Sequence, residues 1–261
     1  MILGRIIRHK IEEVSRKKAA LSLPELRRRI SGMKPVCDFK AAIDSGDVAI
    51  IAEVKKSSPS RGRIREDFDH VAIARTYEEN GVAAVSVITD HRYFEGRVSF
   101  LSEIREQAGI PLLRKDFVID PYQIYETILF GGDAVLLIAR ILSFQQLRDL
   151  IELSLEMGLA TLVEIHDETD LEKAVSAGAR IIGINNRDLS TFETNLETSI
   201  QLAPLVPGGI TIVSESGIGS RKDVERLLQA DIRVFLVGEA LMMERDIARK
   251  IRELTGKDGG S

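Results

Sequence analysis

From Val48 onward the chain repeats one unit, a short run rich in β-branched residues followed by an amphipathic stretch. Several of these runs are continuously apolar, which is typical of parallel strands covered on both faces. The predicted strands are residues 48–54, 83–89, 111–117, 134–139, 160–166, 180–185, 210–215 and 234–238. Eight consecutive βα units predict an α/β fold, a single (β/α)8 TIM barrel. A doubly wound open sheet is the alternative, although no Gly-rich dinucleotide fingerprint follows the first strand.

The segments between the predicted strands carry helix start and stop signals. Asp120 is placed to cap a helix that has Pro121 at its first position and Gly131 beyond its end. Ser143 and Ser220 open two further helical patterns in the same way. These signals support a regular alternation of strands and helices.

The first 47 residues differ from the repeats. Apolar residues recur there at helical spacing, and "LPELRRRI" predicts a second short helix with a proline near its start. We therefore expect an N-terminal helical extension (1–47) packed on a barrel (48–255), followed by a disordered tail (256–261).

Composition excludes several classes of protein. Apolar residues make up 44% and the formal net charge is −4, so the chain is not expected to bind nucleic acid. No apolar run reaches about 18 residues and no signal peptide is recognisable, so no membrane association is expected. The single cysteine, Cys37, suits a reducing compartment, and the four histidines lack metal-ligand spacing. We expect a cytoplasmic monomer without a bound metal.

Polar residues gather at the ends of the predicted strands, where barrels of this kind place their active sites. They are Glu53, Lys55, Lys115, Glu164, Asn185, Arg187, Glu215, Ser216, Gly238 and Glu239. Any one Lys–Glu pair could be a structural ion pair. Several charges buried together are costly unless they are paired or used, so the set predicts an active site.

Two turns predict a phosphate site. "SESGIGSRKD" and "LVGEALM" place glycines directly before helices, after predicted strands seven and eight. Backbone N–H groups at helix starts bind anions, and these two loops commonly hold phosphate in such barrels. The alternative is that the glycines only form tight turns.

Seven stretches resemble the indole-3-glycerol-phosphate synthase family, in family order and over nearly the whole chain from Val48. They are "IIAEVKKSSPSRG", "VSVITDHRYFEG", "PLLRKDFVIDPYQI", "LVEIHDETDL", "IGINNRDLSTF", "VSESGI" and "LVGEALM". The resemblance implies a carboxy-lyase of tryptophan biosynthesis that needs no cofactor. Its substrate would be 1-(2-carboxyphenylamino)-1-deoxyribulose 5-phosphate, a phosphosugar with an anthranilate ring, closed to indole-3-glycerol phosphate with loss of carbon dioxide and water.

The resemblance also implies roles for four charged residues. Lys115 matches the general acid that protonates the ketone oxygen during ring closure. Lys55 matches the lysine that pairs with the substrate carboxylate or acts as an acid in dehydration. Glu164 matches a catalytic carboxylate, and Glu53 matches a base or an organiser of the lysines.

The remaining matches concern substrate contacts. Asn185 and Ser216 match substrate-contacting positions of the catalytic set, and Arg187 and Glu215 match supporting ones. The implied phosphate-binding residues are Ser58, Ser216, Gly217, Gly238 and Glu239. The implied wall around the anthranilate ring is Pro59, Phe94, Phe117 and Leu136.

Two positions depart from the family pattern. Arg97 stands where the family often has serine, and Ala240 where it often has a hydroxyl-bearing residue. Two other functions stay open: another phosphosugar isomerase barrel of the tryptophan or histidine pathway, and a natural or engineered barrel without catalysis. The second is disfavoured because every proposed acid and base is present.

The lysines and the loop after the first strand carry further expectations. Burial and a neighbouring ammonium would lower the pKa of Lys115 toward neutrality, while adjacent glutamates would oppose this. We therefore expect Lys55 and Lys115 to influence each other's titration. The polar loop 57–68, which includes Arg61, could close over the phosphosugar or be an ordinary surface loop.

Overall fold

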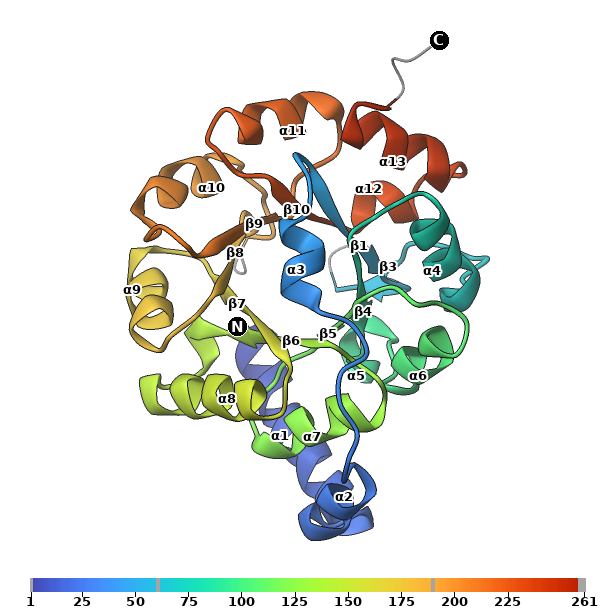
Figure 1. The fold of residues 1–261 in the computed structure, drawn as a ribbon, viewed down its shortest axis with the longest axis vertical. Helices are drawn as coiled ribbons and strands as arrows, with labels where there is room; N and C mark the ends of the chain where they lie inside the picture. Colours follow the sequence, from blue (N-terminus) through green and yellow to red (C-terminus); the bar gives the residue numbers. More distant parts are fainter. Residues whose placement is uncertain (1, 60–61, 189–190, 258–261) are drawn as a thin grey trace.

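Eight parallel strands close into a barrel in the computed structural model, which describes residues 2–59, 62–188 and 191–257 (Figure 1). The spatial order of the strands is β1-β10-β9-β8-β7-β6-β5-β4. Their bounds are β1 (Ala49–Val54), β4 (Ala84–Ile88), β5 (Leu112–Lys115), β6 (Ala134–Ile138), β7 (Ala160–Ile165), β8 (Ile181–Asn185), β9 (Thr211–Glu215) and β10 (Val234–Val237). Each lies inside a predicted strand, so the TIM-barrel prediction is confirmed and the doubly wound alternative is wrong.

The apolar runs form strands because both faces of the barrel wall are buried. Every residue of β1 is buried. Ile50 and Ala52 pack outward against the helices, whereas Ala49 and Ile51 pack into the barrel interior. Alternating residues of one strand thus belong to two apolar clusters, which is why the sequence shows no polar alternation.

The helices surround the barrel and begin where the capping signals predict. Asp120 accepts a hydrogen bond from the Tyr122 N–H, and Ser143 and Ser220 cap their helices through capping boxes. The barrel helices are α4 (His70–Glu79), α5 (His91–Phe94), α6 (Ser99–Arg105), α7 (Pro121–Leu129), α8 (Phe144–Glu156), α9 (Glu168–Ser176), α10 (Glu197–Leu202), α11 (Arg221–Leu228), α12 (Glu239–Met242) and α13 (Ile247–Thr255), with short 3-10 turns η1 (Ala139–Ile141) and η2 (Ala203–Leu205).

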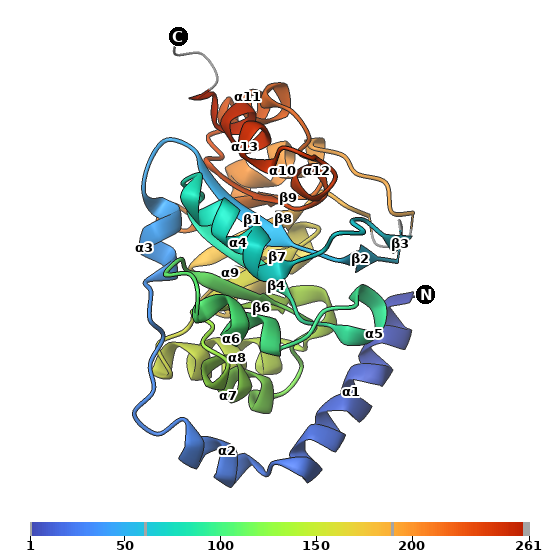
Figure 2. The same cartoon turned by 90° about the vertical axis from the view of Figure 1, so that its right-hand side faces the viewer.

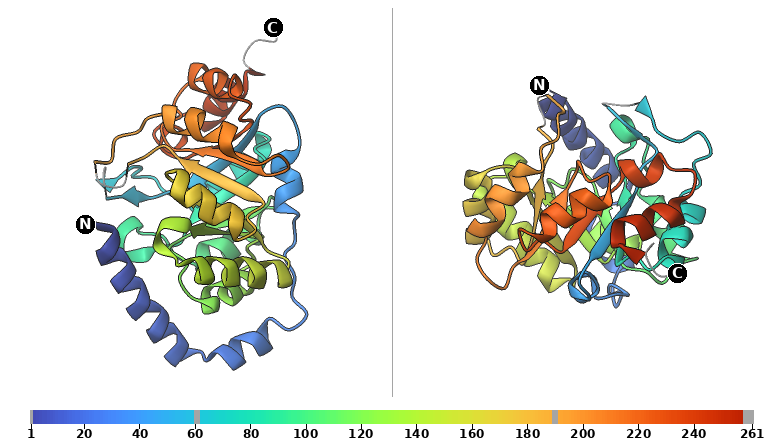
Figure 3. Two further views of the ribbon diagram at one scale, coloured as in Figure 1. Left: turned by 90° about the vertical axis from the view of Figure 1, so that its left-hand side faces the viewer. Right: turned by 90° about the horizontal axis from the view of Figure 1, so that it is seen from above.

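Three helices precede the barrel, and they reach both of its ends. Helices α1 (Ile2–Ala20) and α2 (Leu23–Arg29) were predicted, but α3 (Phe39–Asp44) was not. Figures 2 and 3 show α1 on the side of the carboxyl ends of the strands, next to α5, and α3 at the opposite end. Phe39 and Ile43 of α3 are each 1% exposed and pack on the inward residues of the strands. Helix α3 therefore plugs the bottom of the barrel.

A small antiparallel hairpin occupies the predicted loop 57–68. Its strands are β2 (Ser57–Ser58) and β3 (Gly62–Arg63), and Arg61 lies outside the described residues. Lys56 and Arg63 form ion pairs with Glu95 at 3.2 and 3.3 Å, which attach the hairpin to the segment after α5. Closure of this segment over a ligand stays a prediction.

The sequence placed the end of the barrel at residue 255 and a tail at residues 256–261. Gly256, the first residue of the expected tail, caps α13 in the left-handed conformation with φ of 76°. The rest of the expected tail, residues 258–261, lies outside the described residues, and the division into extension and barrel stays a prediction. Over the described ranges, no helix has the length and apolar character required to cross a bilayer.

Asp133 ties the segment before α3 to the barrel wall. Its carboxylate is buried and accepts hydrogen bonds from the N–H groups of Val36, Cys37 and Leu112 at 2.8 to 2.9 Å. It also forms an ion pair with Arg105. Removal of this carboxylate would leave several buried donors and one guanidinium without their partner.

We predict that Asp133→Ala lowers the free energy of unfolding by about 3–5 kcal/mol, the usual cost of breaking a buried ion pair. Urea denaturation measures this change. Asp47→Ala is the control, because the Asp47 side chain is fully exposed, and its effect should stay within about 0.5 kcal/mol. Equal effects of the two variants would contradict the role of Asp133.

Candidate active site

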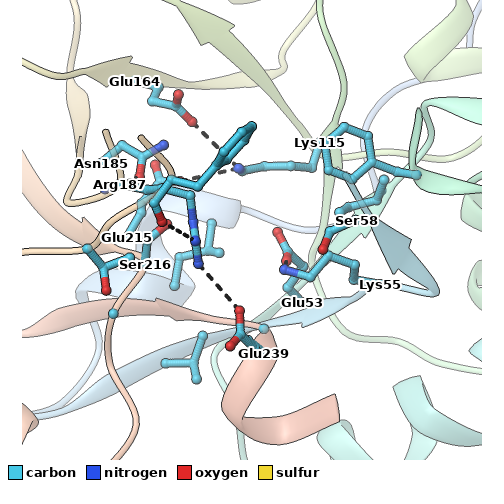
Figure 4. A pocket seen from close by; sticks show the side chains of 18 of the residues that line it. Glu53, Lys55, Ser58, Lys115, Glu164, Asn185, Arg187, Glu215, Ser216 and Glu239 are labelled. Carbon is cyan, nitrogen blue, oxygen red and sulfur yellow. Dashed lines mark hydrogen bonds and ion pairs between the residues drawn. The ribbon is translucent and has the colours of Figure 1, made fainter. Parts of the chain in front are cut away.

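A cavity of about 820 Å³ opens at the carboxyl ends of the strands (Figure 4). Every site residue predicted from the sequence lines it. They are Glu53, Lys55, Ser58, Pro59, Phe94, Lys115, Phe117, Leu136, Glu164, Asn185, Arg187, Glu215, Ser216, Gly217, Gly238 and Glu239. The prediction that these residues gather at one place is thus in accord with the geometry, while the role of each stays a prediction.

Lys115 lies between two carboxylates, as Figure 4 shows. Its Nζ is 3.5 Å from Glu164 Oε2 and 3.4 Å from Glu215 Oε2. The lysine comes from β5 and the glutamates from β7 and β9, so three strands each supply one charge. The Lys115 side chain is 18% exposed, which leaves its ammonium accessible from the cavity.

Lys55 and Glu53 form a second pair at the end of β1. Lys55 Nζ is 2.6 Å from Glu53 Oε1, as expected for two residues on the same side of an extended chain. The neighbouring β10 ends just before Gly238, and a Cβ added there would lie only 2.3 Å from Glu53 Oε1. The glycine therefore leaves the space that the Glu53 carboxylate occupies.

The carboxylates control the charge of Lys115. Burial alone would lower the pKa of Lys115, but Glu215, Glu164 and Glu53 together raise it above its ordinary value. Burial would raise the pKa of Glu53, but Lys55 and Lys115 hold it below its ordinary value. Of the two opposing effects expected from the sequence, the glutamates outweigh burial in this structure.

Glu215 behaves differently from the other carboxylates. Its side chain is 1% exposed, and among the described residues neither of its oxygens has a hydrogen-bond partner. Burial, offset in part by Lys115 and reinforced by Glu164 and Glu53, raises the pKa of Glu215 to about 7. The group is therefore poised to change its protonation near neutral pH.

Gly183 is a feature of the site that the sequence prediction missed. It lies within β8, next to β9, and a Cβ at this position would come within 2.0 Å of Glu215 Oε1. The glycine inside "IIGIN" was the available signal, because a glycine in a strand often marks the close approach of another group.

The segment after β8 is held by its own side chains. Asn185 Oδ1 accepts a hydrogen bond from the Arg187 N–H, and the Arg187 guanidinium donates to the Phe192 carbonyl at 2.8 Å. Arg187 also lies 3.4 Å from Glu239 Oε2. These contacts place Arg187 across the mouth between β8 and the start of α12.

The predicted phosphate region has two distinct parts. Ser216 and Gly217 follow β9 with φ of 68° and 80°, and the first is a costly conformation for a residue with a side chain. The N–H groups of Gly219 and Ser220 donate to Asp223, so the start of α11 is already capped. Ser216, Gly217 and Gly219, which precede α11, line the cavity together with Gly238.

Apolar residues cover the other side of the cavity. The rings of Phe94 and Phe117 lie 6.2 Å apart, and Leu136 lines the wall. Leu3 and Ile6 of α1 also line it, although the sequence prediction placed no extension residue in the site. Their helical spacing indicated a buried face but not what that face would cover.

One of the four histidines, His166, lies beside the site. The buried His166 ring has its Nε2 3.5 Å from Glu164 Oε1, and its backbone N–H donates to Asp170. Among the described residues, no group of three or more His, Cys, Asp or Glu side chains could hold a metal ion.

Comparison with known proteins identifies the family. A family model described as indole-3-glycerol phosphate synthase matches residues 3–254. The chain belongs to the indole-3-glycerol phosphate synthase family. The synthase of Desulforamulus reducens is 44% identical over 99% of this chain and 98% of its own length. That of Dehalococcoides mccartyi is 46% identical over 97% of this chain and 100% of its own length.

More distant structures share the fold. The 3-hexulose-6-phosphate synthase of Salmonella typhimurium superposes with a TM-score of 0.65 at 14% identity, over 80% of this chain and 97% of that one. A chain of the Pyrococcus furiosus tryptophan synthase complex superposes with a TM-score of 0.60 at 14% identity, over 80% of this chain and 98% of that one. At this level of identity the likeness shows the fold alone.

We predict that Gly183→Ala lowers the kcat of this family member roughly 10- to 100-fold, because the new methyl displaces the Glu215 carboxylate. Steady-state kinetics with purified protein measures the change. Gly208→Ala is the control, since a Cβ there meets nothing within 4 Å. Combining Gly183→Ala with Glu215→Asp, which withdraws the carboxylate by one methylene, should restore part of the loss. Unchanged kcat in Gly183→Ala would contradict the steric argument.

The raised pKa of Glu215 gives a pH-dependent stability. A carboxyl whose pKa rises from 4.5 to about 7 on folding stabilises the protein fully below 4.5, and this contribution is lost as the pH rises through about 7. We predict that Glu215→Gln raises the free energy of unfolding at pH 8 by on the order of 1–3 kcal/mol, and that the gain disappears near pH 5. Urea denaturation at both pH values tests this, and an equal gain at both would refute it.

Proposed function

We propose that this chain closes the indole ring of 1-(2-carboxyphenylamino)-1-deoxyribulose 5-phosphate to give indole-3-glycerol phosphate, as a carboxy-lyase of tryptophan biosynthesis. The observation that carries the proposal is the position of Lys115 in the cavity, between Glu164 and Glu215. Membership of the indole-3-glycerol phosphate synthase family supports the same reaction.

Ring closure requires a proton at the ketone oxygen of the sugar. The ring carbon that bears the carboxylate attacks the ketone carbon, and Lys115 donates the proton that turns the ketone oxygen into a hydroxyl. The surrounding carboxylates support this role because they keep the lysine in its ammonium form. They also hold the proton firmly, so donation requires the substrate oxygen to take the place of a carboxylate contact.

Decarboxylation and dehydration then complete the indole. The carboxylate leaves as carbon dioxide, and its bonding electrons restore the aromatic ring. Lys55 would pair with that carboxylate before it leaves, and afterwards protonate the departing hydroxyl. Glu164 would remove the proton from the adjacent carbon, and Glu53 would hold Lys55 at 2.6 Å in the orientation for both roles.

The two ends of the cavity suit the two ends of this substrate. We propose that Phe94, Phe117, Leu136 and Pro59 enclose the anthranilate ring. We propose that the phosphate binds near Ser58, Ser216, Gly217, Gly238 and Glu239, where the backbone of two adjacent turns is exposed to the cavity. Arg187 would offset the charge of Glu239 at this end, since the two side chains are 3.4 Å apart.

An experiment can distinguish the proposed reaction from the two other functions that the sequence left open. A phosphosugar isomerase would share the phosphate turns but would not need two lysines paired with glutamates. A barrel without catalysis would bind a substrate analogue and release no product. Addition of the carboxyphenylamino substrate, with detection of indole fluorescence, separates the three.

The form in which the enzyme acts is also part of the proposal. We propose that it works as a cytoplasmic monomer without a nucleic-acid partner, which the single cysteine and the net charge of −4 support. Elution as a dimer in size-exclusion chromatography would contradict the monomer.

We predict that Lys115→Met folds normally but loses ring closure by at least about 100-fold, the size of one general-acid contribution. Indole fluorescence measures turnover, and circular dichroism verifies the fold. Lys222→Met, on the exposed face of α11, is the control and should retain full activity. Turnover near that of the unmodified enzyme in Lys115→Met would refute the role of Lys115.

A further inference from the structure

Six charged side chains beside the cavity form a closed ring in which positive and negative groups alternate. In order around the ring they are Lys10, Asp116, Arg114, Glu126, Lys17 and Glu13. The successive N···O distances are 2.8, 3.0, 2.7, 3.0, 3.1 and 2.9 Å. Three members come from α1, two from β5 and the residue after it, and one from α7.

The ring joins α1 to β5, and three of its members are almost completely buried. The side chains of Lys10 and Arg114 are 0% exposed and that of Asp116 is 1% exposed. Lys10 also lies 2.9 Å from Asp90, which caps α5. Charges this deeply buried are tolerated only with partners, so the loss of one member leaves its neighbours uncompensated.

The contacts within the ring shift the pKa values of Asp116 and Lys10 toward their charged forms. Burial would raise the pKa of Asp116, but Lys10 and Arg114 hold it well below its ordinary value. Burial would lower the pKa of Lys10, but Asp116, Asp90 and Glu13 hold it above its ordinary value. The contacts of the ring therefore favour the ammonium form of Lys10 and the carboxylate form of Asp116.

Two ring members stand directly on either side of Lys115 in the sequence. Successive side chains of a strand point to opposite faces, so Lys115 points into the barrel while Arg114 points outward. Asp116, the residue after β5, lines the edge of the cavity, where it pairs with Lys10 and Arg114. Both neighbours of Lys115 are held in place by several further contacts. Arg114 also donates to the Gln123 carbonyl, and Asp116 accepts from the Thr89 hydroxyl and the Phe117 N–H.

We propose that Lys10 is a positioning residue for the reaction. Through the ring it immobilises Asp116 and Arg114, and so fixes where the Lys115 ammonium lies between Glu164 and Glu215. Helix α1 thus helps to position the general acid, and it also covers the cavity with Leu3 and Ile6. The inference rests on the proposed function, because it concerns the general acid of that reaction.

Detachment of α1 from the barrel would change the kinetic constants in a different way from displacement of Lys115. Lys18 also joins α1 to the barrel, through an ion pair with Asp120 at 2.7 Å, but neither residue belongs to the ring. Detachment of α1 would remove Leu3 and Ile6 from the cavity wall and raise KM. Displacement of Lys115 lowers kcat with little change in KM, because it weakens an interaction made in the transition state.

The experiment compares Lys10→Met with Lys18→Met in the full chain by steady-state kinetics. We expect Lys10→Met to lower kcat roughly 10- to 100-fold with KM changed less than about threefold, as for a misplaced catalytic group. Lys18→Met should keep both constants within about twofold. Equal effects of the two variants, or a change confined to KM, would overturn the proposal.

A second variant covers the case in which Lys10→Met does not fold. Asp116→Asn keeps the shape of the side chain but removes its charge from the ring, and should lower kcat in the same way. Where both variants fold, the double variant should be no worse than the more affected single one, because both disrupt one unit. Multiplied losses, or full kcat in Asp116→Asn, would overturn the proposal. An unmodified enzyme that forms no indole would instead refute the proposed function itself.

Discussion

The structure depends on one constraint, that a charge buried in a protein must have a partner of opposite sign. The end of strand β5 places three charged residues in succession, Arg114, Lys115 and Asp116, whose side chains are 0%, 18% and 1% exposed. Alternation along the strand sends Lys115 inward to the glutamates and Arg114 outward to the ring anchored on α1. Asp116, just after the strand, joins the same ring through Lys10 and Arg114. The same strand end thus joins two charged clusters, one facing the substrate cavity and one facing the N-terminal helix.

Barrel closure makes the inner cluster possible. Glu53, Lys115, Glu164 and Glu215 are widely separated in the sequence, but all stand at the carboxyl ends of parallel strands that form one ring. Glycines within β8 and directly after β10 leave room for two of the carboxylates. Gly238 leaves space for the Glu53 carboxylate, and Gly183 leaves space for the Glu215 carboxylate. A side chain at either glycine would collide with the neighbouring carboxylate.

The sequence predicted much of this and missed particular parts for physical reasons. The eight strands were predictable because continuous apolar runs require burial on both faces. Helix α3 was missed because it is only six residues long. Its two buried side chains pack against the bottom of the barrel, a surface that forms only when the strands come together. The hairpin of β2 and β3 was missed because a polar stretch with a glycine and a proline is typical of an ordinary loop. The direction of the Lys115 pKa shift could not be decided from the sequence, because it depends on distances to three glutamates from three other strands.

The amino-acid sequence by itself determined the barrel, the strand ends that carry the charged residues and, through its motifs, the family. These follow from local chemistry, since apolar periodicity, capping residues and turn glycines act over a few positions. Only the tertiary structure decided which charges meet. It paired Lys10 with Asp116 across more than a hundred residues, set the Glu215 carboxylate against Gly183, and brought α1 to the cavity wall. Such pairings depend on the distance and burial of groups far apart in the chain, and neither quantity is encoded in any short stretch of sequence.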